Sequence, residues 1–214
     1  MSASTVPTGF LFQYEFLIPR LKKTPTAASS LELSSKEQLP DLSELTGQRH
    51  FADVHAAWTP DGLGLTFHVR RHFEADDKSG ITTDRIRLWI DTRNTKNVHR
   101  ATRFCHQFVL SPLGTSARSS KPTAQQVLIA NAREEASLCD SDQISLDVST
   151  SDDSYTARCW LSKQILHGFD PDGQPQIGFY YEIEDRICGR QTLLVGPEFP
   201  YDFDPSLWQT LRLA

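Results

Sequence analysis

The chain has 214 residues, and its 22 Lys and Arg residues against 27 Asp and Glu residues give a formal net charge of −5 at pH 7. This balance argues against general nucleic-acid binding, which needs a basic footprint, and no apolar run approaches the roughly 18 residues of a membrane-spanning helix. The length predicts a single domain over residues 1–214, with a core large enough to be stable without disulfides.

The N-terminal apolar stretch, residues 10–18, predicts a first β-strand rather than a targeting segment. A signal peptide carries its positive charges ahead of the apolar core, whereas Arg20, Lys22 and Lys23 follow it here. We therefore expect a cytoplasmic protein with reduced thiols. The four cysteines are Cys105, Cys139, Cys159 and Cys188. No two of them have the spacing of a metal-binding knuckle.

Residues 19–48 are rich in Ser, Thr, Pro and Leu and show no strong period. This composition predicts an irregular excursion over the surface, with one helical turn near Ser35–Gln38. A second irregular stretch is predicted over Ser111–Thr123, and the main body of the fold over residues 50–214.

Alternating apolar and polar residues predict strands along the rest of the chain. Residues 63–69 alternate in this way and follow Asp61-Gly62, a hairpin-turn dipeptide. Many short strands separated by turns predict an all-β, antiparallel β-sandwich with one or two short helices and long irregular loops. The other alternating segments are Ile86–Ile90, Ile144–Val148, Tyr155–Cys159 and Ile177–Ile183.

Helical signals are short. Ser162–His167 is predicted as a helix that Ser162 caps and Gly168 ends. Gln125–Ala136 has a strand-like half and a helix-like half, so both interpretations stay open.

The C-terminal tail is expected to close the sandwich. Asp204 is placed to cap a turn that begins at Pro205, a residue favoured at the first helical position. Trp208 and the leucines that follow it are predicted to enter the core, and the alternative is Trp208 as a stacking platform for a ligand.

Four landmarks occur in a characteristic order: Trp58 ahead of a strand, the strand Asp84–Asp91 bounded by acids, Leu161–Gly168 after an amphipathic strand, and Gly178–Asp185. Together they make residues 50–214 similar to carbohydrate-binding module family 9, part of the broader DOMON-like β-sandwich group. The resemblance implies a β-sandwich that binds a saccharide and catalyses no reaction. It raises calcium and haem as cofactors to test, although we predict none.

The polar face of the Asp84–Asp91 strand is the first candidate ligand surface. Alternation places Trp89 beside Arg85 and Arg87, opposite three buried aliphatic residues. An indole ring stacks on a sugar, and guanidinium groups donate directional hydrogen bonds. Tyr180 and Glu182 occupy the polar face of another predicted strand and join this set. The alternative interpretation buries Trp89 under the Ser111–Thr123 loop or the 19–48 excursion.

Residues 84–106 carry a net charge of +4, from six Lys and Arg against two Asp, which leaves −9 on the rest of the chain (16 against 25). Such a focused patch could attract a small anion or an acidic protein partner. Internal pairing with acids such as Glu182–Asp185 is the alternative. The residues expected to supply this potential are His99, Arg100, Arg103 and His106.

Two other groups of side chains are candidates for catalytic or metal-binding sites, and their patterns predict neither. His99, Cys105 and His106 lack a metal signature, and alternation gives His106 the pattern of a core histidine. The loop Asp91–Asn97 offers calcium-ligating oxygens, but turn formation explains its Asp and Asn residues more simply.

A haem site would need axial ligands from His68, His99 or His106. Glu182 and Glu184 lie about 7 Å apart on one strand face, a distance that is compatible with the carboxylate pair of an inverting glycosidase. An exposed strand face gives the same spacing without catalysis. We therefore predict a non-catalytic binding protein for a saccharide or small anion. The alternatives are an assembly subunit that docks an acidic partner through residues 84–106, or a His-ligated haem-binding domain.

Overall fold

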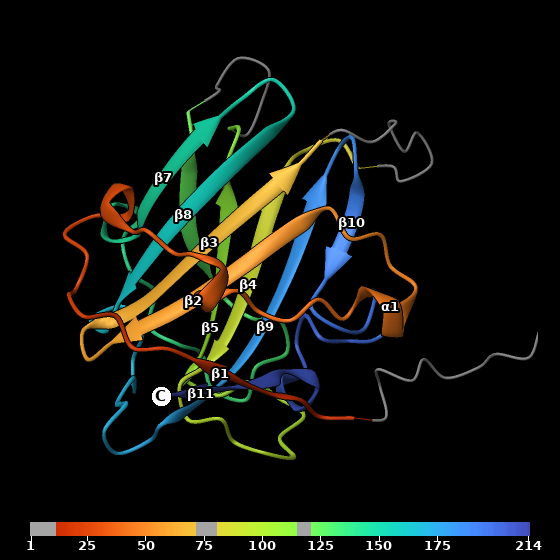
Figure 1. Cartoon of the computed structure of the whole chain (residues 1–214). Helices are drawn as coiled ribbons and strands as arrows, with labels where there is room; N and C mark the ends of the chain where they lie inside the picture. The colour runs from red at the N-terminus through yellow and green to blue at the C-terminus, as the bar shows by residue number, and fades with distance from the viewer. Residues whose placement is uncertain (1–11, 72–80, 115–120) are drawn as a thin grey trace, which may run out of the picture.

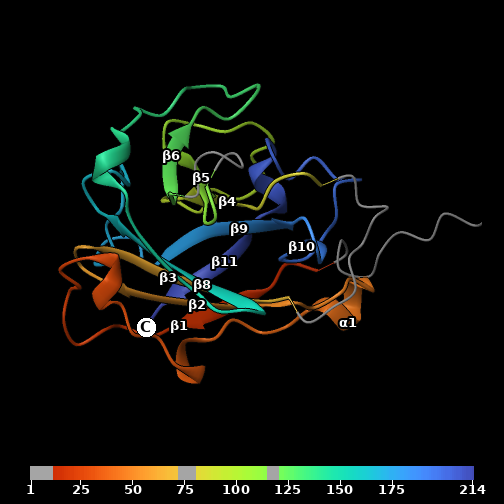
Figure 2. The ribbon, with the colours of Figure 1, turned by 90° about the horizontal axis from the view of Figure 1, so that it is seen from above.

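A computed structural model describes residues 12–71, 81–114 and 121–214, and in it the chain forms two β-sheets packed face to face. Figure 2 shows the two layers, with β2, β3 and β8 in the lower layer and β4, β5, β6 and β9 above them. The fold is mostly β, as predicted, and its few helices are single turns.

The larger sheet holds the strands that build the candidate site (Figure 1). Its order is β1-β11-β9-β4-β5-β6, and β10 pairs with the second half of β9. All pairs are antiparallel except β1 with β11. The strands are β1 (Glu15–Ile18), β4 (Arg85–Asp91), β5 (Cys105–Ser111), β6 (Thr123–Val127), β9 (Gln176–Asp185), β10 (Gly189–Thr192) and β11 (Gln209–Leu213).

The smaller sheet is a four-stranded antiparallel sheet in the order β2-β3-β8-β7. Its strands are β2 (Ala52–Thr59), β3 (Gly62–Arg70), β7 (Ser145–Thr150) and β8 (Ser154–Ser162). The predicted hairpin at Asp61-Gly62 joins β2 to β3. Gly62 is required there because a Cβ atom would lie 2.3 Å from the Leu161 carbonyl oxygen.

The core lies between the sheets, on the faces that the alternating pattern predicted. The aliphatic residues of 63–69, 86–90 and 177–183 are fully buried, and polar residues alternate with them on the opposite face. Burial of each large apolar side chain contributes about 1.5–3 kcal/mol. These contacts fix the register of each strand, since a slip by one residue would reverse its two faces.

The predicted helix at Ser162–His167 is wrong. These residues form hydrogen-bonded turns, in which the Ser162 carbonyl accepts from the amides of Ile165 (3.1 Å) and Leu166 (3.2 Å). Six residues gain too few hydrogen bonds to offset helix nucleation, and burial of Ile165 and Leu166 fixes the turn. The ambiguous stretch Gln125–Ala136 continues strand β6 to Val127 and then turns, so its helical interpretation is also wrong.

The C-terminal tail behaves as predicted. The Asp204 side chain accepts from the amide of Ser206 (2.9 Å) at the start of the short helix η5 (Pro205–Leu207). Trp208 is buried in the core, which excludes it as an exposed platform.

Residues 19–48 run beside β2, which Arg20 and Gln38 bridge, and across the outer face of the smaller sheet, where Leu31 packs against Gly64. Of the predicted strand 10–18, residues 10 and 11 lie outside the described residues, and β1 begins at Glu15. Residues 19–48 contain only short turns of helix. Part of the predicted loop Ser111–Thr123 likewise lies outside the described residues. The helical turns in the 19–48 segment are η2 (Ala28–Ser30), η3 (Ser35–Glu37) and α1 (Ser43–Thr46).

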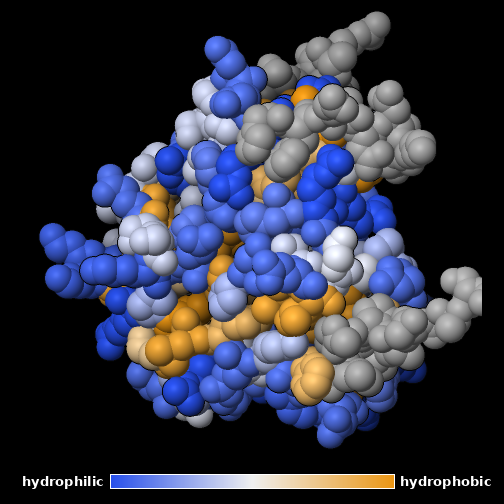
Figure 3. Space-filling model, turned by 45° about the vertical axis from the view of Figure 1, so that its right-hand side comes forward, coloured by the Kyte–Doolittle hydropathy of each residue, from blue (hydrophilic) through white to orange (hydrophobic). Residues whose placement is uncertain are grey.

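Figure 3 shows one face of the molecule, on which an apolar band and smaller apolar patches lie among hydrophilic side chains. No helix within the described ranges is long and apolar enough to cross a membrane.

Candidate functional site

The candidate site lies on the outer face of the larger sheet, where β4 and β9 are neighbours. Their register sets Arg87 opposite Glu182 and Trp89 opposite Tyr180. All four side chains point away from the core because their neighbours along each strand fill it. The sequence pattern therefore predicted the correct face for these residues.

A wall formed by residues 197–202 stands against this sheet face. Between the wall and the sheet lies a cavity of about 320 Å³, which is at the lower end of the size range of small-molecule sites. It is lined by Arg87, Trp89, Gln107, Glu182, Arg190, Pro197, Phe199, Tyr201 and Asp202.

Three aromatic side chains hold this wall in place through hydrogen bonds to its backbone or to the residues that lead into it. The Trp89 indole N–H donates to the Asp202 carbonyl (3.0 Å), and the Trp208 indole N–H donates to the Tyr201 carbonyl (2.7 Å). The Tyr180 hydroxyl donates to the Val195 carbonyl (2.6 Å), just ahead of the wall. The cavity is thus built before any ligand arrives.

The prediction that Trp89 offers its ring for stacking is wrong, and Tyr180, predicted as a ligand-binding residue, is not accessible to a ligand. Trp89 is 1% exposed and Tyr180 is fully buried. The Tyr201 ring packs edge-on against Trp89, with the ring centroids 5.5 Å apart. Burial of Trp89 was the alternative interpretation, and among the described residues the 197–202 wall covers it. Part of the Ser111–Thr123 loop named in that interpretation lies outside the described residues.

Four charged side chains form a network of ion pairs at the cavity. Arg87 pairs with Glu182, and its guanidinium also lies 3.0 Å from Glu184. Arg190, from β10, lies 3.2 Å from Glu182 and 2.7 Å from Glu184. The charges of these four groups sum to zero, and Arg85 adjoins them at the edge, 3.9 Å from Glu184. The charged residues that line the cavity also balance, with Arg87 and Arg190 against Glu182 and Asp202. Internal pairing, one of the two interpretations of the basic stretch, is what the structure shows for Arg87.

The pKa shifts at this cluster keep its donors protonated. Burial disfavours the charge on Arg190, but the carboxylates of Glu184 and Glu182 outweigh it and raise the pKa of the guanidinium. Burial and the Glu182 carboxylate raise the pKa of the Tyr201 hydroxyl. Tyr201 therefore remains a hydrogen-bond donor, and it donates to Glu182.

Gln107 differs from the other polar residues of the cavity. It lines the cavity from β5, and its side-chain amide forms no hydrogen bond with the part of the chain that the structure describes. An amide carries two donors and an acceptor. It is therefore free to bind a ligand that offers both kinds of partner.

The remaining cations of residues 84–106 lie away from this cavity and do not form one positive surface with it. The Arg100 guanidinium donates to the carbonyls of Asn131 (2.9 Å) and Ala132 (3.2 Å). The His99 imidazole contacts Asp204 (3.0 Å). Arg85 lies 3.9 Å from Glu184 and Arg103 lies 3.9 Å from Glu134. Arg93 lies over the Phe104 ring (5.1 Å) and pairs with no carboxylate among the described residues. The cations of this stretch are therefore dispersed over separate local contacts.

His106 cannot supply positive potential as the prediction required. It is fully buried, where one ring nitrogen contacts the Gln126 amide (3.1 Å) and the other contacts the His167 carbonyl (3.2 Å). Burial lowers its pKa to about 4, so the ring is neutral at pH 7. The core interpretation from the alternating pattern is the correct one.

The Asp91–Asn97 loop does not fit calcium. Asp91 is buried, and its two carboxylate oxygens accept from the amides of Arg93 (2.9 Å) and Thr95 (2.7 Å). Asn94 and Asn97 adopt positive φ angles of 46° and 58°, as turn residues do. Within the described ranges no group of three or more His, Cys, Asp or Glu side chains could hold a metal ion.

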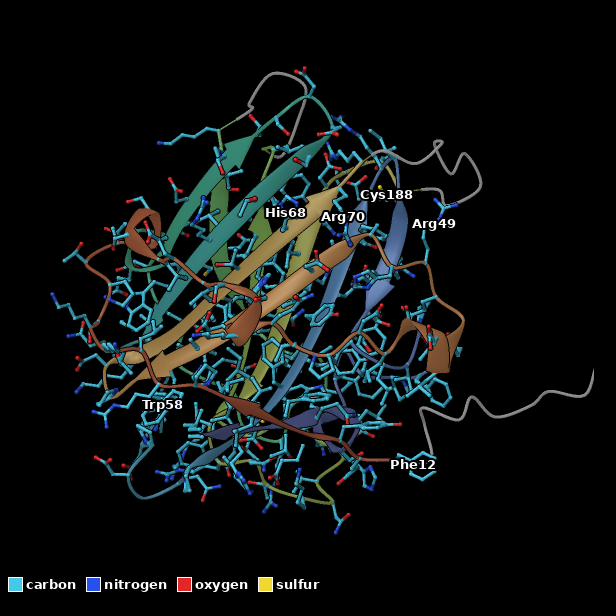
Figure 4. The ribbon with its side chains drawn as sticks, viewed as in Figure 1. Phe12, Arg49, Trp58, His68, Arg70 and Cys188 are labelled. Carbon is cyan, nitrogen blue, oxygen red and sulfur yellow. The ribbon has the colours of Figure 1, made fainter. Side chains whose placement is uncertain are left out.

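The histidines proposed for haem lie in separate environments. His68, on β3 of the smaller sheet (Figure 4), contacts the Thr156 hydroxyl (3.0 Å). His99 lies in an exposed loop, and His106 is enclosed between Gln126 and His167. None of the three shares a described cavity with another.

The buried thiols are poor nucleophiles. Burial raises the pKa of Cys105, Cys159 and Cys188 to about 12 in each case. A thiol must lose its proton to attack, so these three residues act as small apolar side chains.

Sequence reasoning missed Gln107, Arg190, Phe199 and Tyr201 as lining residues. The wall sequence GPEFPYD carries two aromatic residues, one on either side of Pro200, which was the available signal. Its position depends on contacts such as Trp89 with Asp202, which join residues 113 positions apart.

No family model matches the sequence, and no curated protein matches it. Solved structures do match the fold. A family 9 carbohydrate-binding module from Caldicellulosiruptor kristjanssonii, in complex with cellotriose, aligns with a TM-score of 0.59 and 11% identity over 94% of this chain and 93% of that one. The same organism's module in complex with glucose aligns at 0.57 and 10% identity, over 94% and 96% of the two chains.

A candidate carbohydrate-binding protein from Bacteroides uniformis aligns with a TM-score of 0.54 and 11% identity, over 95% of this chain and 100% of that one. These structural alignments, at TM-scores of 0.54–0.59 over most of each chain, show that the fold is that of family 9 carbohydrate-binding modules, as the sequence resemblance implied. The wider DOMON-like grouping stays a prediction.

Proposed function

We propose that this chain, with the fold of family 9 carbohydrate-binding modules, binds an uncharged saccharide in the cavity between the larger sheet and the 197–202 wall. The observation that carries the proposal is the zero formal charge of the cavity lining, in which Glu182 and Asp202 balance Arg87 and Arg190. The same fold in the two Caldicellulosiruptor modules accompanies bound cellotriose and glucose, which supports a saccharide as the ligand.

The charge balance favours a sugar over an anion. An anion would have to compete with Glu182 and Glu184 for the donors of Arg87 and Arg190, and it would add a negative charge to a neutral cluster. A sugar hydroxyl both donates and accepts, so it can add to the paired groups without separating them. The free amide of Gln107 offers the same two-way bonding.

The wall supplies the apolar part of the site. Phe199 is partly exposed at the cavity, and the Tyr201 ring lines it beside the edge of Trp89. Aromatic surface of this kind packs against the C–H groups of a sugar ring. The saccharide site is therefore aromatic on one side and polar on the other.

The proposed role is binding without catalysis. Glycoside hydrolysis uses two carboxyl groups on either side of the scissile bond. Glu182 lines the cavity, whereas Glu184 lies outside the lining, and arginines pair both of them. The two glutamates are thus one edge of an ion-pair cluster and do not flank a common space.

Isothermal titration calorimetry with glucose and cellotriose tests the proposal, with glucuronate and inorganic phosphate as the anionic comparison. We expect heat of binding for at least one neutral sugar and a weaker or absent signal for both anions. Binding of glucuronate or phosphate more tightly than either sugar contradicts the proposal, as does silence across the panel.

The variant Gln107→Ala removes the free amide and should weaken sugar binding about tenfold, since a lost hydrogen bond to a ligand costs about 0.5–1.5 kcal/mol. Gln125→Ala is the matched control, because Gln125 is exposed on β6, the strand next to β5 in the same sheet, and outside the cavity. The control should bind like the wild type. Equal affinities for both variants would place the ligand elsewhere.

A further inference from the structure

A second hollow lies where the chain leaves β1 and loops out before η2, on the left of Figure 1. Two cavities of about 480 and 460 Å³ adjoin there and share Leu21–Thr24. They have no lining residue in common with the saccharide cavity. Whatever binds in this hollow is therefore separate from the proposed saccharide.

The hollow carries positive charge that the fold leaves unsatisfied. Lys22 and Lys23 are exposed, and neither forms an ion pair or hydrogen bond with the described residues. The Arg20 guanidinium lies over the Trp58 ring, 5.4 Å from its centroid, and meets no carboxylate in that part of the chain. Most cations of residues 84–106, in contrast, lie within 4 Å of a carboxylate or donate to a backbone carbonyl.

The carboxylates at the hollow do not cancel this charge. Asp61 already lies 3.2 Å from the Lys163 ammonium and accepts a hydrogen bond from Thr24 (2.9 Å). Glu32 lines only the larger cavity. A surplus of positive charge therefore remains along Arg20–Lys23.

The larger cavity is lined in part by three apolar side chains, those of Leu21, Pro25 and Leu31. Leu31 is buried against the smaller sheet, so closely that a Cβ atom on Gly64 would lie 2.8 Å from its Cδ1 atom. The hollow thus combines an apolar floor with a basic rim.

Backbone hydrogen bonds fix both ends of the loop that encloses the hollow. The Leu21 amide donates to the Trp58 carbonyl (2.8 Å) beside β2, whose residue Trp58 is labelled in Figure 4. The Ala28 amide donates to the Ser145 hydroxyl (2.8 Å) on β7. A hollow that exists before binding costs little ordering entropy when a partner arrives.

We propose that this hollow docks an acidic peptide segment of a partner protein. Apolar side chains of the segment lie on the floor of Leu21, Pro25 and Leu31, and its carboxylates pair with Arg20, Lys22 and Lys23. The acidic-partner surface is thus at residues 20–31 rather than at 84–106.

Charge favours a short acidic peptide over a nucleic acid. Without these three cations the chain carries a net charge of −8, from 19 Lys and Arg against 27 Asp and Glu. A long polyanion extends beyond the hollow and meets this negative surface, whereas a peptide of a few residues stays within it.

Fluorescence anisotropy tests the proposal with a fluorescein-labelled ten-residue peptide of alternating Leu and Glu. We expect saturable binding to the full chain that the double variant Lys22→Glu/Lys23→Glu weakens at least tenfold. The matched control is Lys36→Glu/Lys121→Glu, which makes the same charge change at exposed lysines outside the hollow. The control should retain most of the affinity.

Three outcomes overturn the proposal. Equal weakening by both double variants shows a response to net charge alone. If a peptide of alternating Leu and Gln binds as tightly as the Leu–Glu peptide, the basic rim is not needed. If a peptide of Glu alone binds as tightly, the apolar floor is not needed. A twenty-base single-stranded DNA that binds more tightly than the Leu–Glu peptide assigns the surface to a nucleic acid. Unchanged sugar binding by Lys22→Glu/Lys23→Glu confirms that the variant is folded.

Discussion

Strand β9 contributes acids to two ion-pair clusters that look alike in the sequence and differ in the structure. The open cluster, Arg87, Glu182, Glu184 and Arg190, lies at the saccharide cavity, and its two arginine side chains are 23% and 34% exposed. The closed cluster is centred on Arg71, Asp84 and Asp185, and its Arg71 side chain is only 13% exposed. The exposed Arg186 adjoins it at the surface, 3.4 Å from Asp84. Burial decides which of the two a ligand can reach.

The closed cluster also joins different parts of the sandwich. Arg71 follows β3 of the smaller sheet, and its guanidinium contacts Asp84 (2.6 Å) ahead of β4 and Asp185 (2.7 Å) at the end of β9 in the larger sheet. Asp185 also accepts from the amides of Ile187 and Cys188 (both 2.9 Å). We infer that the closed cluster serves stability and the open cluster serves binding.

The largest expected effect comes from Asp185→Asn. It removes a charge that Arg71 faces in a buried site, and loss of one partner of a buried pair costs about 3–5 kcal/mol. Urea denaturation should show this loss in the free energy of unfolding. Glu184→Gln, one residue earlier on β9, should cost about 1 kcal/mol, because its partners are partly solvated. Equal losses would erase the distinction between the clusters.

The loss of stability in acid reports on the two clusters only after the contribution of His106, which lies in neither of them, has been subtracted. Its pKa in the folded protein is about 4, below its ordinary value of 6.5. Between these values the unfolded chain binds a proton that the folded protein does not, so the free energy of unfolding falls as the pH is lowered from about 6.5 to about 4.

A shift of this size corresponds to a loss of about 3 kcal/mol over that window. Urea denaturation at pH 7 and pH 4.5 measures it, with His106→Gln as the variant in which this part of the pH dependence should disappear. If the free energy of unfolding of His106→Gln falls between pH 7 and pH 4.5 as much as that of the wild type, the acid sensitivity comes from the carboxylates of the two clusters.

The faces of the strands were predictable because they depend on local alternation. Arg87, Trp89 and Glu182 fall on one face from the period of two alone, and His106 falls in the core for the same reason. The cover over Trp89 was not predictable, because Asp202 arrives through contacts between distant parts of the chain. Whether a group of charged residues stays accessible to a ligand or is buried depends on which distant segment of the chain packs over it.

Glu182→Gln tests whether charge balance sets the preference for a neutral ligand. The change leaves Arg87 and Arg190 with one carboxylate between them, Glu184, so the open cluster gains a net positive charge. We expect affinity for glucose or cellotriose to fall about tenfold and affinity for glucuronate to rise by a similar factor. Calorimetry with both ligands measures the exchange. A parallel fall for both would mean that Glu182 only shapes the cavity.

The smallest expected effect is that of Trp89→Phe, which keeps an aromatic ring and removes the N–H donor to the Asp202 carbonyl. The lost hydrogen bond should lower the free energy of unfolding by about 1 kcal/mol and loosen the wall, so sugar affinity falls a few-fold. Trp208→Phe removes the neighbouring donor to Tyr201 and serves as the matched variant. If Trp89 met the ligand directly, Trp89→Phe would weaken binding far more than Trp208→Phe at equal loss of stability. Similar effects on binding show that both indoles act through the wall, which makes Trp89 a positioning residue of the open cluster.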